Sequence, residues 1–429
     1  LLATVACTRL RSQCAAVLSA PMKRSKGKKE EKKNQANKNQ DQPQSAILMM
    51  SIRLAASLVV CLCGLAAGTS DSFRSEAEGK TSIFLRVPFF FVTQALLNDL
   101  FLGLGLQLAR RICGDPGNLP WDPTKDESIH HDTRIAWPAI ELPKELQKYK
   151  SKTGQPFFLN HVTGRQRCKD ACMRLGMGIG ALLGVWFMSL CMDKRSLSLL
   201  GFTLDGAFFV DSIIGLAVGI TIVSFMFGVE LLAGWVVFLQ FFEVFDPSEN
   251  FWLCIFWDVV FHLNVAINEE LPVRGWLLYN LAEAGAVYLD LSAIAAFLFA
   301  MVLESVLFVV MHLPSPGGTR PLSMLNIFVG GMAGGLNVLL TGGRLGFALG
   351  WHFGWNISMG NVFGRSTSGI PISATFVSVV PHPRKEQLHG GVFGPEGGVI
   401  SPAAYFLGII LLALIYGLPD FGSQNLLVR

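Results

Sequence analysis

Residues 251–275, with the sequence FWLCIFWDVVFHLNVAINEELPVRG, combine a long apolar run with a cluster of charged side chains at its end. A membrane-spanning helix needs about 20 mostly apolar residues. Charged groups in such a run are costly unless they face a protein interior or a water-filled cavity. We therefore interpret Glu269, Glu270 and Arg274 as part of an internal site within a helical membrane bundle.

The apolar part of this run also carries Asp258 and His262. At 100° per residue, Asp258, His262 and Glu269 fall within about 40° of one another on a helix. We expect this shared face to point toward a wet cavity. Because Pro272 lacks the backbone N–H that a continuing helix needs, the helix is predicted to bend or end there.

The adjacent carboxylates Glu269 and Glu270 point about 100° apart on a helix, so they cannot do the same job. Arg274 follows Glu270 by one turn, which suits an ion pair. We predict that Glu269 is the catalytic carboxylate, since it shares its face with Asp258 and His262. Glu270 is then predicted to pair with Arg274. The sequence leaves the reverse assignment open.

Two further polar pairs lie in later apolar runs: Phe308 with His312, and His352 with Asn356. The members of each pair are one helical turn apart and share a helix face. An imidazole and an amide on one face can polarise a carbonyl or stabilise an oxyanion. A single buried histidine is more often a hydrogen-bonded core residue, but three polar clusters in successive apolar runs favour a hydrolytic site.

The composition excludes a soluble globular protein. Only 15% of the 429 residues are charged and 51% are hydrophobic, whereas soluble domains carry about 25% charged residues. The apolar windows predict an all-α polytopic membrane protein with about eight transmembrane helices and a small extramembrane segment that could be β. These windows are 83–107, 175–193, 207–244 (long enough for two helices), 251–267, 291–313, 324–341, 344–360 and 402–418.

Residues 1–48 form a basic tail that lacks the apolar content to fold. No aromatic residue interleaves its lysines, so we predict no nucleic-acid binding. Residues 49–70 are typical of a signal peptide or an uncleaved anchor. The rest divides into a transmembrane helix at 83–107, an extramembrane loop at 108–170, transmembrane helices at 175–250 and the candidate catalytic membrane domain at 251–418.

Within the loop, residues 142–170 resemble a WW domain, which is a small β module. The resemblance rests on Leu142-Pro143 and on the sequence GQPFFLNHVT at 154–163. Leu146 and Cys168 stand where the pattern has its two tryptophans. Since the second tryptophan lines the groove for a proline-rich ligand, we expect a structural role or a protein partner for this segment. An unrelated loop with a chance match is the alternative.

The nine cysteines show no paired C-x-x-C spacing, so the sequence does not predict a zinc ribbon. Cys191 and Cys254 lie in apolar windows, where a cysteine usually acts as a small hydrophobic residue. No histidine is spaced to suggest a cysteine protease.

The three polar clusters together resemble the signature of the CPBP family, the CAAX proteases and bacteriocin-processing enzymes also called the Abi family. Its motifs are Glu-Glu-x-x-x-Arg, Phe-x-x-x-His and His-x-x-x-Asn or Asp, in that order on successive transmembrane helices. Here they are matched by NEELPVRG at 268–275, LFVVMHL at 307–313 and LGWHFGWN at 349–356. A late glycine-rich loop, GGVFGPEGG at 390–398, also resembles the family. One departure is Val273, where many members have an aromatic residue.

This resemblance implies an intramembrane endopeptidase that hydrolyses peptide bonds in membrane proteins or lipidated peptides, including prenylated CAAX-type substrates. It implies that Glu269 and His312 activate a water molecule, while His352 and Asn356 hold the oxyanion. Glu269, His312 and His352 also make a plausible set of ligands for zinc or another divalent metal. A metal-free glutamate base with a histidine partner is equally compatible with these residues.

Two other functions stay open at this stage. The first is a catalytically silent membrane scaffold that keeps the fold and binds a partner, for which residues 142–170 are a candidate surface. The second is a secondary transporter that uses the buried charges, although only one helix break, at Pro272, is evident. The expected location is a multi-pass position in a plastid membrane or an endomembrane, with the organelle unresolved.

Overall fold

The computed structural model describes residues 74–75, 80–81, 83–113, 162–382 and 385–418. The predicted basic tail at 1–48, the signal-peptide-like segment at 49–70 and most of the WW-like segment lie outside these residues.

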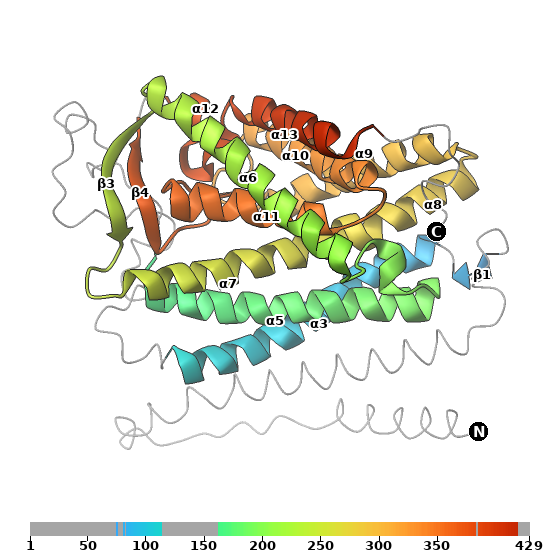
Figure 1. Ribbon diagram of the computed structural model, residues 1–429. Helices are drawn as coiled ribbons and strands as arrows, with labels where there is room; N and C mark the ends of the chain where they lie inside the picture. Colours follow the sequence, from blue (N-terminus) through green and yellow to red (C-terminus); the bar gives the residue numbers. More distant parts are fainter. Residues whose placement is uncertain (1–73, 76–79, 82, 114–161, 383–384, 419–429) are drawn as a thin grey trace, which may run out of the picture.

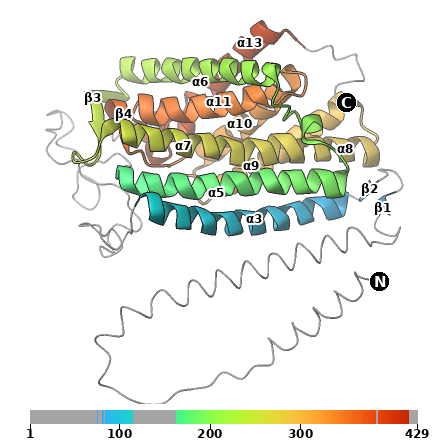
Figure 2. The ribbon, with the colours of Figure 1, turned by 60° about the horizontal axis from the view of Figure 1, so that its bottom comes forward.

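The described chain is a bundle of helices with a two-stranded sheet at one end (Figure 1). Helices α3, α5 and α7 lie side by side, and α11 and α6 follow beyond α7 (Figures 1 and 2). The helices are α3 (Ile83–Ile112), α5 (Gly164–Met188), α6 (Gly206–Leu232), α7 (Phe251–Glu270), α8 (Leu278–Tyr288), α9 (Ala293–His312), α10 (Pro321–Leu340), α11 (Gly346–Ile357), α12 (Glu386–His389) and α13 (Ser401–Tyr416). The strands are β1 (Arg74–Ser75), β2 (Lys80–Thr81), β3 (Val236–Val244) and β4 (Ala374–Pro381).

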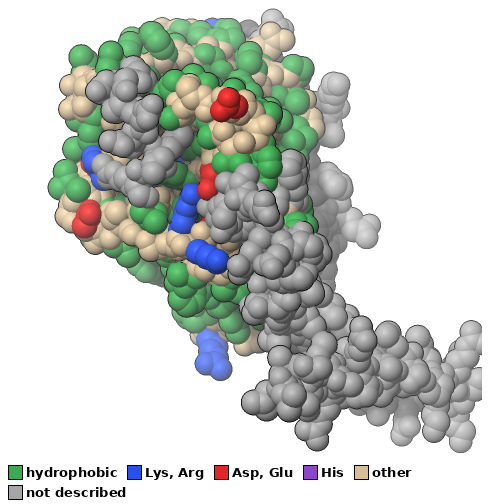
Figure 3. All heavy atoms as spheres, turned by 90° about the vertical axis from the view of Figure 1, so that its right-hand side faces the viewer, with side chains coloured by type: hydrophobic (Ala, Val, Ile, Leu, Met, Phe, Trp, Pro, Cys, Tyr) green, Lys and Arg blue, Asp and Glu red, His purple; other side chains and the backbone are tan. Residues whose placement is uncertain are grey.

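The prediction of an all-α polytopic membrane protein is confirmed. Among the described residues, six helical segments are long and apolar enough to cross a membrane. The last two predicted windows contain the shorter helices α11 and α13. Large hydrophobic side chains are exposed along the helices, among them Ile213, Phe406 and Leu414. Such a surface suits contact with lipid tails rather than water. Figure 3 views the molecule from the right-hand end of Figure 1, where hydrophobic side chains and a few charged ones are visible.

The prediction of two helices within residues 207–244 is wrong. One helix, α6, ends at Leu232, and Gly234 then turns the chain with a φ of 63°. Residues 236–244 form β3, which pairs antiparallel with β4 from Val236 opposite Pro381 to Val244 opposite Ala374. Apolar content alone does not separate a buried helix from a strand, and Val and Phe favour the strand here.

The helix that begins at Phe251 does not end at Pro272. It runs to Tyr288 as one 38-residue segment, with a π-helical stretch at Leu271–Leu277 between α7 and α8. A π-helical turn makes wider-spaced hydrogen bonds and inserts an extra residue, so it can absorb the missing N–H of the proline without ending the helix. The irregularity therefore lies beside the paired carboxylates at the end of α7.

Helix α11, which carries the third polar pair, packs closely on α6 through glycines. A side chain at Gly350 would collide with the backbone carbonyl of Ser212, and one at Gly215 with that of Phe347. Small residues at such contacts let two membrane helices approach closely. This contact fixes the position of α11 inside the bundle.

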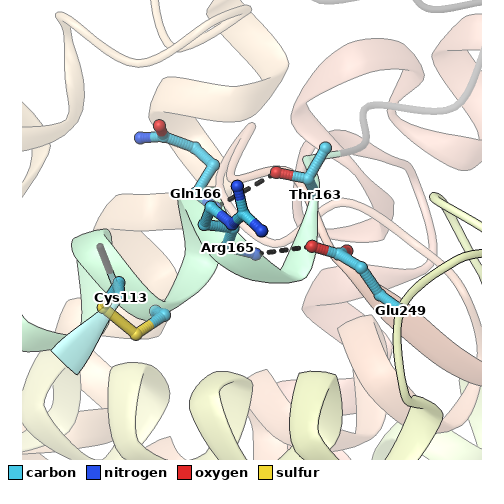
Figure 4. The surroundings of a disulfide bond; sticks show 6 residues. Cys113, Thr163, Arg165, Gln166 and Glu249 are labelled. Atoms are coloured by element: carbon cyan, nitrogen blue, oxygen red, sulfur yellow. Dashed lines mark hydrogen bonds between the residues drawn. A yellow bond between two sulfur atoms is a disulfide. The ribbon is translucent and has the colours of Figure 1, made fainter. Parts of the chain in front are cut away.

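A disulfide bond joins Cys113, just past α3, to Cys168 in α5 across a sequence separation of 55 (Figure 4). The cysteine spacing did not predict it. Helix α5 begins at Gly164, with Thr163 capping it by accepting a hydrogen bond from the N–H of Gln166 at 3.1 Å. Cys168 therefore lies in a helix, and the part of the predicted WW-like segment from Gly164 to residue 170 is not β.

Removal of this disulfide is expected to lower stability, because the bond restricts the unfolded chain. The expected loss in the free energy of unfolding for Cys168→Ser is roughly 2–4 kcal/mol. Thermal unfolding in detergent under non-reducing conditions measures it, with Cys191→Ser as the control, since Cys191 is an exposed free cysteine. Equal midpoints for both variants and the wild type would contradict the bond's role.

Candidate active site

Three helices bring a carboxylate and two imidazoles together. Glu269 lies at the end of α7, His312 is the last residue of α9, and His352 lies in α11. The Oε2 atom of Glu269 is 3.9 Å from Nε2 of His312 and 3.9 Å from Nε2 of His352. All three side chains are partly exposed. A carboxylate so placed can share a small molecule such as water with both imidazoles.

Hydrogen bonding orients the ring of His312. Its Nδ1 lies 2.8 Å from the carbonyl oxygen of Phe308, and a carbonyl only accepts, so Nδ1 carries the hydrogen. Nε2 then faces Glu269 with a free lone pair in the neutral ring. The ring also packs on the Phe308 side chain, with the centroids 4.5 Å apart.

His352 is held by the second carboxylate of the pair. Its Nδ1 donates a hydrogen bond of 2.7 Å to Oε1 of Glu270. The same oxygen accepts a hydrogen bond of 3.2 Å from Nη1 of Arg274. Glu270 and Arg274 are both buried, whereas Glu269 reaches the histidines. The predicted ion pair between Glu270 and Arg274 is therefore present, and the Glu269 carboxylate lies near both histidines.

Arg274 has a second carboxylate that the sequence motifs did not include. Glu304, fully buried in α9, places Oε1 3.7 Å from Nε of Arg274. The guanidinium carbon lies 4.1 Å from the centre of the Phe308 ring. The only sequence signal for Glu304 is that it is the single charged residue in the apolar run AIAAFLFAMVLESVLFVVM at 293–311.

A partly open cavity adjoins these groups. Glu270, Arg274, His312, His352 and Asn356 line it, together with apolar side chains of α10, α11 and α13. Five of the six predicted site residues therefore line one cavity. Glu269 is not among its lining residues, but its carboxylate lies 3.9 Å from Nε2 of both cavity-lining histidines. The cavity combines apolar walls with several charged and polar groups, a combination found in substrate sites.

The late glycine-rich loop closes one side of this cavity. Glu396 accepts a hydrogen bond of 2.8 Å from Nε1 of Trp355 and one of 2.7 Å from the hydroxyl of Ser368. Trp355 stacks on Tyr405 of α13 with the ring centres 4.8 Å apart. The loop sequence resembles that of the family, but neither Glu396 nor Tyr405 was predicted as a site residue.

A neutral histidine, His389, holds the start of the glycine-rich loop by two hydrogen bonds. Burial lowers the pKa of His389 to about 4. Its Nε2 donates to the carbonyl oxygen of His382 at 2.9 Å, while Nδ1 accepts the N–H of Gly391 at 3.2 Å. Because one ring nitrogen must accept, only the neutral ring makes both bonds.

Asp258 and His262 do not line the cavity, contrary to prediction. Asp258 forms an ion pair with Arg167 of α5 and accepts hydrogen bonds from Asn361 at 2.7 Å and from the Ser373 hydroxyl at 2.6 Å. His262 is fully buried. This helix face was expected to point toward a wet cavity, but α5 packs against α7 there and its Arg167 pairs with Asp258.

Glu269, His312 and His352 offer donor types that zinc accepts. Their spacing does not fit a single shared metal ion, since ligand atoms around tetrahedral zinc lie about 3.3 Å apart. Within the described chain, the one group of three or more His, Cys, Asp or Glu ligand atoms mutually within 4.8 Å is Cys113, Cys168 and Cys172. The two histidines are therefore too far apart in this arrangement.

Comparison with known proteins supports the family resemblance. Residues 250–358 match the family model described as "Type II CAAX prenyl endopeptidase Rce1-like". No curated protein and no solved structure matches the chain. The matched region includes all three polar clusters and supports an intramembrane endopeptidase in general terms. The match at residues 250–358 covers only part of the chain and is consistent with the resemblance to the CPBP family.

Proposed function

We propose that the protein hydrolyses peptide bonds of membrane-associated substrates within the cavity, with Glu269 as the general base. The observation that carries this proposal is the position of the Glu269 carboxylate, 3.9 Å from Nε2 of both His312 and His352. A carboxylate and two imidazoles around one small space are suited to proton transfer during water attack.

The first step is activation of a water molecule. Its two hydrogens are accepted by the Glu269 carboxylate and by Nε2 of His312, which leaves an oxygen lone pair for the substrate carbonyl carbon. As the carbon–oxygen bond forms, one proton passes to Glu269. The C=O electrons move onto the carbonyl oxygen, which becomes an oxyanion.

In this proposal, His352 and Asn356, which both line the cavity, stabilise that oxyanion. The Asn356 side-chain amide donates an N–H, and a protonated His352 donates Nε2–H while Nδ1–H stays bonded to Glu270. Donors that are already oriented stabilise developing charge without reorganisation. When the intermediate collapses, the C–N bond breaks and Glu269 returns its proton to the leaving amine. The products are a carboxylic acid and an amine. The acid then passes its proton to the amine, which gives a carboxylate and an ammonium ion.

The surroundings of the cavity favour a substrate that comes from the bilayer. Phe308, Trp351 and Tyr405 form apolar walls, and the cavity lies within a helical bundle that has a hydrophobic outer surface. We propose a membrane-anchored or lipidated peptide as substrate, with a prenylated C-terminal peptide as the first one to test. Apolar walls can bind such a lipid group by excluding water.

The test is cleavage of a panel of farnesylated and unmodified membrane peptides in proteoliposomes. Glu269→Gln is expected to lower the rate by about 10²–10⁴-fold, because it removes the general base. The control is Glu386→Gln, which neutralises an exposed acid paired with Arg320. Cleavage by Glu269→Gln at the wild-type rate would contradict the proposal. Absence of all cleavage by folded wild-type protein would favour the scaffold.

Metal dependence can be examined on the same samples. Because the spacing of the three candidate ligands does not fit one shared metal, we expect strong chelators to leave the cleavage rate unchanged. Elemental analysis by mass spectrometry should then find no stoichiometric zinc or other transition metal in active protein. A stoichiometric metal whose removal stops cleavage and whose return restores it would contradict this expectation.

A further inference from the structure

Glu304 has no role in the motifs of this domain, although its position is energetically costly. It lies two turns before His312 in a membrane helix and is fully buried. Within the described chain, neither of its carboxylate oxygens has a hydrogen-bond partner. Charged residues inside membrane helices are expensive and usually functional. Its one ion pair is the contact of Oε1 with Nε of Arg274 at 3.7 Å.

Arg274 lies in a narrow slot between a ring and a glycine. One face of the guanidinium covers the Phe308 ring at 4.1 Å. A Cβ atom at Gly334 of α10 would lie only 2.7 Å from Nε of Arg274, so a larger residue there would displace the guanidinium. The two carboxylates approach from different edges, Glu270 at Nη1 and Glu304 at Nε.

Contacts on two different edges restrict the orientation of the Arg274 guanidinium more than a single contact does. A guanidinium held only at Nη1 can turn about that point, whereas a second carboxyl group 3.7 Å from Nε attracts that edge and favours one orientation in the plane. Neutralising Arg274 needs only Glu270. The second carboxylate therefore adds orientation rather than simple charge balance.

The orientation of Arg274 affects both histidines. Through Glu270, the guanidinium fixes the carboxylate oxygen that binds Nδ1 of His352 at 2.7 Å. Through Phe308, it supports the ring on which His312 packs, and the carbonyl of the same residue binds Nδ1 of His312 at 2.8 Å. Both series of contacts, through Glu270 and through Phe308, start at Arg274. Glu304 of α9 contacts Arg274 and can therefore affect both.

We infer that Glu304 is a positioning residue for the proposed hydrolysis: it holds Arg274 so that Glu270 and Phe308 keep both imidazoles aimed at Glu269. The inference rests on the proposed endopeptidase function. Glu304 does not touch the reacting atoms, so its removal affects turnover through the geometry of the histidines.

The experiment measures kcat and KM for the wild type and Glu304→Gln on whichever panel peptide is cleaved, per molecule of folded protein. The glutamine keeps the size of the side chain and removes its charge. We expect kcat to fall about tenfold to a hundredfold, since small misplacement of catalytic groups is costly. KM should stay within about twofold, because uniform substrate binding is not altered.

Asp211→Asn is the matched control. Asp211 is also a buried carboxylate that holds an arginine, Arg344, and it accepts a hydrogen bond of 2.7 Å from Tyr416. It does not line the cavity. This variant is expected to lose stability while keeping the wild-type kcat per folded molecule. A wild-type kcat for Glu304→Gln as well would overturn the inference.

A double-mutant cycle tests whether Glu304 acts through Arg274. When Arg274 is already Lys, adding Glu304→Gln should lower kcat no further, whereas independent losses that multiply would overturn the inference. If Glu304→Gln does not fold, Glu304→Asp takes its place, because it keeps the charge but shortens the reach to Arg274. The same fall in kcat is then expected.

Parallel measurements on the wild type and on Glu269→Gln separate the proposed hydrolysis from the positioning role of Glu304. An active wild type with an equally active Glu304→Gln refutes the positioning role alone. A folded wild type that cleaves no peptide refutes the proposed function, and the positioning role falls with it.

Discussion

The buried guanidinium of Arg274 is the constraint around which the site is built. It is only 1% exposed, and an isolated charge removed from water destabilises a protein unless close partners compensate it. The partners come from three helices: Glu270 precedes it on its own helix, Glu304 and Phe308 lie on α9, and Gly334 on α10 leaves the space. The contacts of Arg274 that hold these helices together are therefore also the contacts that orient the two histidines.

The sequence predicted the local parts of this arrangement. Helix geometry places Arg274 one turn after Glu270, so the ion pair was predictable without a structure. It also separates Glu269 from Glu270 by about 100°, which predicts different roles for them but left open which carboxylate has which role. The long-range contacts were not accessible in this way. Glu304 has no partner near it in the chain, because Arg274 lies 30 positions earlier on another helix. Nothing in the sequence around Asp258 indicates that Arg167 covers it.

The sequence predicted which segments are apolar and that most of them are membrane helices, but not the structure of every segment. Composition and window length suffice for a polytopic helical protein, since lipid excludes other backbone arrangements. They do not distinguish β3 from a second helix after α6, because an apolar run fits both. They also do not show that the chain passes Pro272 in a π-helical turn, which depends on how α7 and α8 pack within the bundle.

The assignment of roles around Glu269 is tested most directly by a structure with a bound peptidyl trifluoromethyl ketone, which hydrates to a tetrahedral gem-diol. One gem-diol oxygen should lie within hydrogen-bond distance of Glu269 and His312, at the place of the attacking water. The other should lie within reach of His352 and Asn356, at the place of the oxyanion. A gem-diol bound away from Glu269, or held by a metal ion between the two histidines, would contradict the account.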